Sequence, residues 1–162
     1  MLDGEHNVTL DEKGRLFIPA KVRAAFGEER TFTVTRGVDQ FRCLWLFGPS
    51  EWKIISEQIR ANTSLFNAKT RVLERRLLAP ATTCELDRSN RIIIPQSLRD
   101  AAGLTRDVKL LVCISRIEVW DREEYERYLE ASDEELVEAA EDLGDRIHFP
   151  EGKLKKEESN LK

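Results

Sequence analysis

The sequence has few of the residues that most often carry catalysis or bind metals. It contains two histidines, His6 and His148, and three cysteines, with no Cys-x-x-Cys spacing and no histidine near a cysteine. It also has no nucleophile paired with a base, no phosphate-binding glycine loop and no cluster of metal ligands. We therefore expect neither an enzyme nor a bound cofactor, metal or small-molecule substrate.

Long apolar runs are also missing. No window approaches the roughly 18 apolar residues that a membrane-spanning helix requires. The first residues, MLDGEHNVTL, have neither a basic stretch nor an apolar run. We expect no membrane contact and a cytoplasmic location. The cysteines Cys43, Cys84 and Cys113 lie in apolar, strand-like stretches and are predicted to be small core residues in a reducing compartment.

The net charge of −4 does not favour nucleic-acid binding, but the charge is unevenly distributed along the chain. Residues 121–162 contain 15 acidic and 7 basic residues, a net charge of −8. The remaining 15 acidic and 19 basic residues give residues 1–120 a net charge of +4. The first three quarters of the chain are therefore basic and the C-terminal part is acidic.

The sequence does contain an internal repeat. Residues 10–27, LDEKGRLFIPAKVRAAFG, match residues 86–103, LDRSNRIIIPQSLRDAAG, after a shift of 76 positions. Unrelated segments would share roughly one or two identities over this length. The identical pairs are Leu10/Leu86, Asp11/Asp87, Arg15/Arg91, Ile18/Ile94, Pro19/Pro95, Arg23/Arg99, Ala25/Ala101 and Gly27/Gly103. The chain therefore contains two copies of one structural unit.

Each copy begins with the pattern of a hairpin. An aspartate follows an apolar residue, three turn residues come next, and an arginine then leads into an apolar run that ends in proline. The last turn position holds glycine or asparagine, the residue types that most readily adopt positive φ. The pattern predicts an arginine at an exposed corner and a largely buried second strand. The turn-forming residues are Asp11 and Gly14 in the first copy and Asp87 and Asn90 in the second.

A short helix and a second pair of strands follow each hairpin. Pro19 and Pro95 suit the first helical position, and Gly27 and Gly103 suit the residue after the helix end. The segments TFTVTRG and CLWLF, and then VKLLVCI and RIEVW, are rich in β-branched and aromatic residues. One such unit cannot cover its own apolar strands. We therefore expect both copies to pack about a pseudo-twofold axis into one small barrel.

Further helices are predicted between and after the copies. Ser50 begins one, and the basic segment KTRVLERRLLA forms the next. Asp121 with Glu124, and Ser132 with Glu135, have the spacing of helix caps. The expected fold is α+β and mainly β. The expected boundaries are 5–51 and 81–124 for the two copies, 52–80 for the connecting helices, 125–144 for the C-terminal helices and 145–162 for a disordered tail.

These features together resemble the MraZ family of bacterial transcriptional regulators. The resemblance is carried by GEHNVTLDEKGRLFIPAKVR, VTRG, ELDRSNRIIIPQSLRDAAGL and RIEVWDREEY, and it runs from about Gly4 to Tyr128. Each copy is similar to a SpoVT-AbrB domain, a swapped-hairpin unit whose D-x-x-x-R signature spans Asp11 to Arg15 and Asp87 to Arg91. The second turn has Asn90 where the family usually has glycine, and asparagine tolerates the same backbone conformation.

The resemblance implies a nucleoid-associated DNA-binding regulator whose subunits form rings. It also implies binding to short tandem repeats in the promoter of the division and cell-wall gene cluster, which includes the regulator's own gene. The implied partners are double-stranded DNA and further copies of the chain. The acidic extension after about Tyr128 is outside the shared pattern, so no role is carried over to it.

The candidate DNA-binding residues are Arg15, Arg91, Lys13 and Arg88. An arginine at a hairpin corner could fork onto phosphate or onto guanine, and the lysine and the third arginine could add phosphate contacts. The alternative for Arg15 and Arg91 is a local ion pair that closes each turn, worth at most about 1 kcal/mol. The alternative for Lys13 and Arg88 is an ordinary solvated charge, favoured for Arg88 because its counterpart is Glu12.

Other features have more than one interpretation. The basic run of Lys69, Arg71, Arg75 and Arg76 could follow a DNA backbone, but its amphipathic pattern favours a solvated or subunit-facing helix. The aromatic residues Trp45, Phe47, Trp52 and Trp120 are expected to pack in a core or interface rather than stack on bases. A second functional hypothesis is an antidote that neutralises a toxin enzyme through its acidic C-terminal part.

Overall fold

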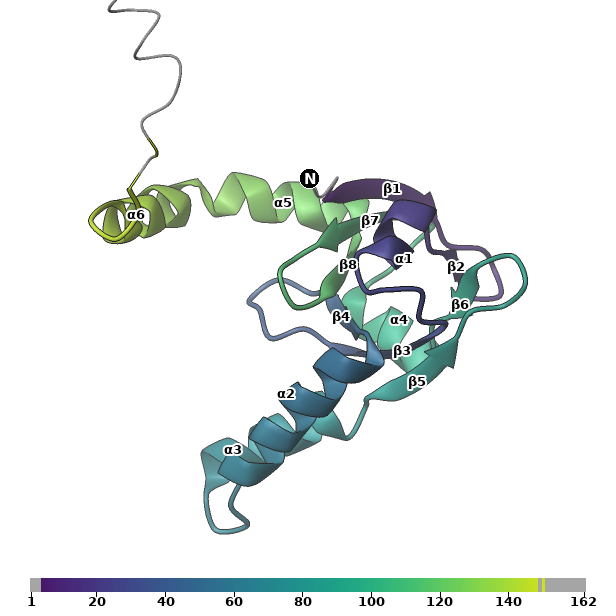
Figure 1. Ribbon diagram of the computed structural model, residues 1–162, viewed down its shortest axis with the longest axis horizontal. Coiled ribbons are helices and arrows are strands. Elements are labelled where there is room, and N and C mark those ends of the chain that lie inside the picture. Colours follow the sequence, from purple (N-terminus) through teal and green to yellow (C-terminus); the bar gives the residue numbers. More distant parts are fainter. Residues whose placement is uncertain (1–3, 149, 151–162) are drawn as a thin grey trace, which may run out of the picture. The chain divides into compact units, whose positions relative to one another are not determined.

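The computed structural model describes residues 4–148 and 150. The chain divides into two compact units, Met1–Arg127 and Tyr128–Lys162. The first unit contains both copies of the repeat and the helices that connect them (Figure 1). Most of the tail that is predicted to be disordered, 145–162, lies outside the described residues.

The two copies have the same order of elements, as the repeat predicts. Each consists of two strands, a short helix and two more strands. The first copy comprises β1 (Glu5–Thr9), β2 (Arg15–Phe17), α1 (Ala20–Ala24), β3 (Thr31–Arg36) and β4 (Leu44–Phe47). The second comprises β5 (Thr82–Glu85), β6 (Arg91–Ile93), α4 (Gln96–Ala102), β7 (Asp107–Val112) and β8 (Ile117–Asp121).

The copies exchange their first strands. β1 of the first copy pairs with β7 of the second, and β5 of the second copy pairs with β3 of the first. The six-stranded antiparallel sheet has the order β1-β7-β8-β4-β3-β5, so corresponding strands of the two copies lie at equal distances from its centre. This arrangement confirms the α+β fold with two intertwined units.

Backbone hydrogen bonds outside the sheet follow the same pseudo-twofold symmetry. The Leu10 N–H donates to the Arg106 carbonyl at 2.8 Å, and the equivalent Leu86 N–H donates to the Arg30 carbonyl at 2.8 Å. These bonds hold the start of each turn against the other copy. The position of each turn is therefore set by residues from both copies.

The second strands of the two hairpins form a separate ladder. β2 pairs with β6 in antiparallel register, with Leu16 opposite Ile92 at its centre. Both of these side chains are fully buried, whereas Phe17 and Ile93 are 44% and 61% exposed. The prediction of a largely buried second strand is therefore wrong for these two residues. Side chains alternate between faces along a strand, so one face of this ladder packs on the core and the other faces solvent.

The short helices begin one residue later than predicted. Pro19 and Pro95 have extended backbones, with ψ of 151° and 144°, and precede α1 and α4 as cap residues. Gly103 caps α4 with a left-handed backbone, as expected. Gly27 also has a positive φ, but α1 already ends at Ala24 and irregular turns lie between them.

Three helical segments connect the copies: α2 (Pro49–Asn62), α3 (Ala68–Leu73) and the π-helical η1 (Glu74–Leu78). The first begins at Pro49 rather than at Ser50, and no side chain caps it. Leu77 is buried and its carbonyl accepts a hydrogen bond from the Thr35 hydroxyl at 2.6 Å. Arg75 and Arg76 are exposed, as a solvated helix face requires.

Two helices follow β8: α5 (Arg122–Ala131) and α6 (Asp133–Gly144). The predicted cap at Asp121 is present, since its Oδ2 accepts from the Glu124 N–H at 3.4 Å. The predicted cap at Ser132 is wrong, because its side chain makes no capping hydrogen bond. Within the second unit, α6 leaves Leu136 and Leu143 exposed.

The cysteines are unpaired thiols. Cys43 and Cys84 are buried as predicted, and Cys113 is half-buried. Burial raises the pKa of Cys43 to about 12 and that of Cys84 to about 11, so both are protonated at neutral pH. No described helix is both long enough and apolar enough to cross a membrane.

The alternation of burial along β6 predicts very different costs for two neighbouring isoleucines. Ile92→Ala should lower the free energy of unfolding by about 2 to 4 kcal/mol because it leaves a cavity in the core. Ile93→Ala should cost less than about 1 kcal/mol because this side chain already contacts water. Urea denaturation of both variants measures the difference. Equal losses would contradict the described orientation of the ladder.

Candidate nucleic-acid interface

The first turn is organised by the carboxylate of Asp11. Its Oδ1 accepts hydrogen bonds from the backbone N–H groups of Lys13 and Arg15, at 3.0 and 2.9 Å. Its Oδ2 accepts from Nε of the Arg15 guanidinium at 2.6 Å. The Gly14 N–H donates to the Asp11 carbonyl at 3.0 Å, and Gly14 has a φ of 80°. Asp11 thus fixes both the backbone of the turn and the direction of the arginine.

The second turn repeats this arrangement. Asp87 Oδ1 accepts from the backbone N–H groups of Ser89 and Arg91, at 2.8 and 3.0 Å, and Oδ2 accepts from Arg91 Nε at 3.0 Å. Asn90 has a φ of 59° and is the single described residue other than glycine with a positive φ. The left-handed position predicted for both turns is confirmed.

Each aspartate binds only one edge of its guanidinium. The Nε edge is used by the carboxylate, and among the described residues no hydrogen-bond partner faces the two terminal nitrogens of either arginine. Both arginine side chains are 32% exposed. The geometry therefore combines the two sequence interpretations, because an ion pair closes each turn and the outer fork of the same guanidinium remains available to a ligand.

The ladder brings the two arginines to one surface. Arg15 lies opposite Ile93, and Arg91 lies opposite Phe17. Opposed residues of a ladder share a face, so all four side chains lie on the solvent side, and the ladder geometry separates the two arginine Cα atoms by about 8 to 9 Å. We call these four residues the arginine face. Figure 1 shows both turns at the same edge of the first unit.

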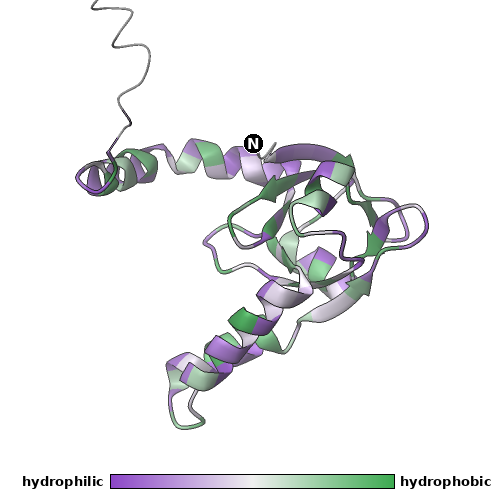
Figure 2. Ribbon diagram, in the orientation of Figure 1, coloured by the Kyte–Doolittle hydropathy of each residue, from purple (hydrophilic) through white to green (hydrophobic). Residues whose placement is uncertain are grey.

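The remaining candidate residues lie within the turns themselves. Lys13 and Arg88 are exposed, so both can reach a ligand that approaches the arginine face. Figure 2 shows the turn between β5 and β6 in the purple of hydrophilic residues. The turns therefore present charged side chains at this edge of the first unit.

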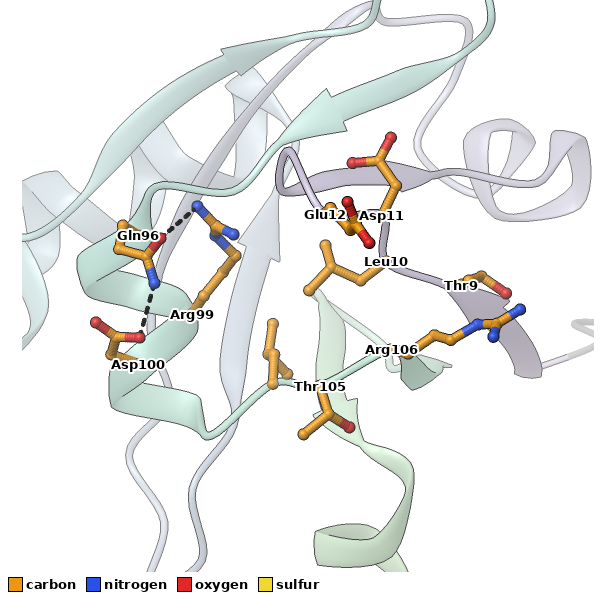
Figure 3. Close-up of a pocket in the computed structure, with 10 residues that line it drawn as sticks. Thr9, Leu10, Asp11, Glu12, Gln96, Arg99, Asp100, Thr105 and Arg106 are labelled. Carbon is orange, nitrogen blue, oxygen red and sulfur yellow. Dashed lines mark hydrogen bonds between the residues drawn. The ribbon is translucent and has the colours of Figure 1, made fainter.

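A pocket of about 580 Å³ lies beside the first turn. Arg99 and Arg106 line it together with the acidic residues Asp11, Glu12 and Asp100 (Figure 3). The Arg99 guanidinium donates to the Gln96 side chain at 2.9 Å, and Gln96 in turn donates to Asp100 at 2.9 Å. Charges of both signs line this pocket, and the side chains of Arg99, Gln96 and Asp100 are hydrogen-bonded to one another.

The aromatic residues do not form a DNA-binding surface. Phe47 and Trp120 are buried, and Phe47 packs against both Trp45 and Trp52, with ring centroids 6.3 and 5.5 Å apart. The Arg116 guanidinium lies 4.6 Å from the Trp45 ring. These aromatic residues pack as predicted rather than forming a stacking surface for bases. Within residues 4–148 and 150, no group of three or more His, Cys, Asp or Glu side chains could hold a metal ion.

Comparison with known proteins identifies the family. A sequence model of the family described as "MraZ protein, putative antitoxin-like" matches the chain twice, at residues 1–76 and 77–147. The chain belongs to the MraZ family. Its two matches correspond to the two copies of the repeat, so the resemblance seen in the D-x-x-x-R turns extends over nearly the whole chain.

Several MraZ relatives match the chain along almost all of their own length. The Transcriptional regulator MraZ of Treponema denticola is 46% identical over 144 residues, which cover 89% of this chain and 98% of the relative. That of Treponema pallidum is 42% identical, with 88% and 93% covered. That of Natranaerobius thermophilus is 36% identical, with 90% and 98% covered.

Two sets of residues near the turns were not predicted from the sequence. Phe17 and Ile93 share the exposed face with the arginines, and the strict in-out alternation of a ladder was the signal for them. Arg30 contacts the second turn directly. Arg30 corresponds to Arg106 in the second copy, at the same 76-residue offset. This identical pair lies three residues after Gly27/Gly103, the last pair given above.

The pKa values of the two turn aspartates are lowered by their hydrogen bonds. The backbone N–H of Arg15 lowers the pKa of Asp11 below 3.8, and the Arg15 guanidinium adds to this effect. The backbone N–H of Arg91 does the same for Asp87. Because these pKa values are lower in the folded state than in the unfolded chain, the two ionised carboxylates stabilise the fold. This stabilisation is fully present above the unfolded-state pKa and is lost as the pH falls through the folded-state pKa.

Mutation separates the two groups that lower the pKa of Asp11, the backbone N–H and the guanidinium of Arg15. Arg15→Ala removes the guanidinium but keeps the backbone N–H, so the pKa of Asp11 should rise toward its ordinary value. Carboxyl carbon NMR titration measures it, and the pKa of Asp87 in the same sample serves as the control. A pKa of Asp11 at or above 3.8 in the unmodified chain would contradict the described hydrogen bonds.

Proposed function

We propose that the chain is a transcriptional regulator that binds double-stranded DNA through the arginine face. The observation that carries this proposal is the pair of guanidinium groups whose inner edges are held by Asp11 and Asp87 and whose outer forks face solvent. Two parallel N–H donors suit a phosphate or the O6 and N7 atoms of guanine. Membership of a family whose relatives are named transcriptional regulators supports the same function. The name of these relatives, transcriptional regulator, does not describe an enzyme.

Charge and geometry support DNA as the partner. Residues 1–120, which contain both turns, carry a net charge of +4 despite the acidic total. The β2–β6 ladder places Arg15 and Arg91 on one face, so a single duplex could contact both guanidinium groups. Lys13 and Arg88 add phosphate contacts at the edges of this surface.

One chain presents only a small surface, so we propose that the working form is a ring of several copies. Linking several weak contacts on a tandem site raises the total affinity without any new contact. The loop between α2 and α3 carries Leu65 and Phe66, which are 73% and 93% exposed and give a second copy an apolar surface to cover. We further propose that the DNA sites are tandem repeats upstream of the division and cell-wall gene cluster, and that the protein works in the cytoplasm on the nucleoid.

An antidote that neutralises a toxin enzyme is the second candidate function. One observation favours it. Helix α6 of the second unit carries an exposed apolar stripe on an acidic helix, formed by Leu136, Ala139, Ala140, Leu143 and the following Ile147. Such an amphipathic helix could dock in a groove of a partner protein. The two functions use different parts of the chain and are therefore separable by mutation.

Replacing either arginine of the arginine face should weaken DNA binding without unfolding the protein. If a guanidinium reads guanine, Arg15→Ala or Arg91→Ala should cost about 1 to 3 kcal/mol and relax the preference at one base. If it binds phosphate, affinity should fall equally on all sequences and the salt slope should drop by about one per contact. Fluorescence anisotropy with a labelled duplex from upstream of the chain's own gene measures both quantities.

Arg116→Ala is the matched control for these variants. Arg116 is also partly exposed and ion-paired, at 2.7 Å to Glu118, but it lies in the loop between β7 and β8, at the opposite end of β7 from the Arg106 carbonyl that holds the first turn. Its loss should change DNA affinity less than about threefold, the size of a general charge effect. Unchanged affinity in Arg15→Ala and Arg91→Ala, with normal melting temperatures, would remove the proposal.

Mutation of α6 separates the regulator from the antidote. The double variant Leu136→Ser and Leu143→Ser removes the apolar stripe, and removal of everything after Gly144 deletes the last part of the acidic segment. Residues 145–162 contain 4 acidic and 5 basic residues and the double variant changes no charge, so both variants should leave DNA affinity nearly unchanged. A folded variant that no longer binds the duplex would contradict this division of roles.

A further inference from the structure

Arg30 connects the first copy of the repeat to the second turn, which lies between β5 and β6. It lies between α1 and β3, and its backbone carbonyl accepts from the Leu86 N–H at 2.8 Å. Its Nη2 donates to the Asp87 carbonyl at 2.8 Å, and its Nη1 donates to Asn90 Oδ1 at 3.4 Å. One residue of the first copy therefore contacts the start and the left-handed position of a turn that belongs to the second copy.

These contacts act on the atoms that close the turn. The Asp87 carbonyl also accepts the Asn90 N–H at 3.0 Å, so Arg30 binds the same oxygen that closes the turn. A positive φ costs free energy in a residue with a side chain, and the Arg30 contact with the Asn90 amide offsets part of that cost. Because Asp87 in turn holds Arg91 through Nε, a shift of this turn would move the Arg91 guanidinium.

The first turn has different neighbours. Gly14 has no side chain that could accept from Arg106, the counterpart of Arg30. The Arg106 side chain extends toward Thr9 in Figure 3 rather than toward Asp11. Instead, the Arg99 guanidinium covers Gly14 so closely that a Cβ there would lie 2.7 Å from Arg99 Cζ. Glycine in one turn and asparagine in the other thus correspond to two different arginine contacts from the opposite copy.

We propose that Arg30 is a positioning residue for Arg91, holding the second turn so that the Arg91 fork meets DNA in a fixed direction. This inference rests on the proposed function, because it assigns Arg30 a role in DNA binding through Arg91. Two competing roles for Arg30 lead to different experimental results. Arg30, which is itself exposed, could contact DNA directly, or it could stabilise the fold without affecting the turn.

A double-mutant cycle separates positioning from direct contact. Arg30→Ala should weaken binding to the labelled upstream duplex about three- to tenfold, the effect of losing one or two hydrogen bonds that orient a charged group. In the Arg91→Ala background the same change should have almost no further effect, since there is no longer a guanidinium to position. Equal, additive losses in both backgrounds would show that Arg30 meets DNA itself and would overturn the proposal.

Two further variants control for charge and folding. Arg106→Ala removes the same charge at the corresponding position of the other copy, where Gly14 offers no side-chain acceptor in place of Asn90. It should weaken binding less than about twofold. Arg30→Lys keeps the charge but loses the planar fork, so its affinity should lie between those of Arg30→Ala and the unmodified chain. If Arg106→Ala weakens binding as much as Arg30→Ala, the effect is one of charge alone and the proposal fails.

Amide hydrogen exchange without DNA provides a readout independent of binding. In Arg30→Lys and Arg30→Ala, the Asn90 and Arg91 N–H groups should exchange faster while Gly14 and Arg15 remain unchanged. Unaltered exchange in the second turn would overturn the positioning role even if affinity fell. If Arg91→Ala itself leaves affinity unchanged, the proposed DNA-binding function of Arg91 fails instead. Faster exchange in Arg30→Ala would then show that Arg30 only stabilises the structure of the turn.

Discussion

The fold depends on the fact that neither copy of the repeat can complete its own sheet. β1 pairs with β7 and β5 pairs with β3, so each copy supplies the edge strand of the other. The same exchange brings β2 and β6 into one ladder, whose buried side covers the core with Leu16 and Ile92. Since the hairpins that are exchanged carry the two Asp–Arg turns, the interaction that buries the apolar strands also places both turns at one edge.

The turns show how a short motif can hold a flexible side chain. An exposed arginine normally samples many conformations, and ordering it on binding costs free energy. Here a carboxylate that is already fixed by two backbone N–H groups binds Nε of each arginine. Part of the ordering is therefore done by the fold, and the outer fork points in a direction set by the ladder. The ion pair and the proposed ligand-binding role are thus compatible uses of one guanidinium.

Features that depend on local chemistry could be predicted from the sequence, and features that depend on contacts between copies could not. The offset of the repeat, the left-handed positions of Gly14 and Asn90, and the α+β class follow from residue types and spacing. The exposure of Phe17 and Ile93 was missed because an unbroken apolar run hides the alternation between faces. Arg30 was missed because its partners lie 57 and 60 residues away in the sequence. Ser132 has the spacing of a cap, but its backbone φ of −105° and ψ of 7° is not the extended conformation that a capping serine adopts.

The central claim is that the outer forks of Arg15 and Arg91 are the groups that meet DNA. The most direct test is a structure of the chain bound to a duplex from upstream of its own gene. The account predicts that the terminal nitrogens of both arginines lie about 2.7 to 3.2 Å from phosphate oxygens or guanine acceptors, while each Nε stays on its aspartate. A duplex bound to another surface, with the arginine face exposed to solvent, would contradict it.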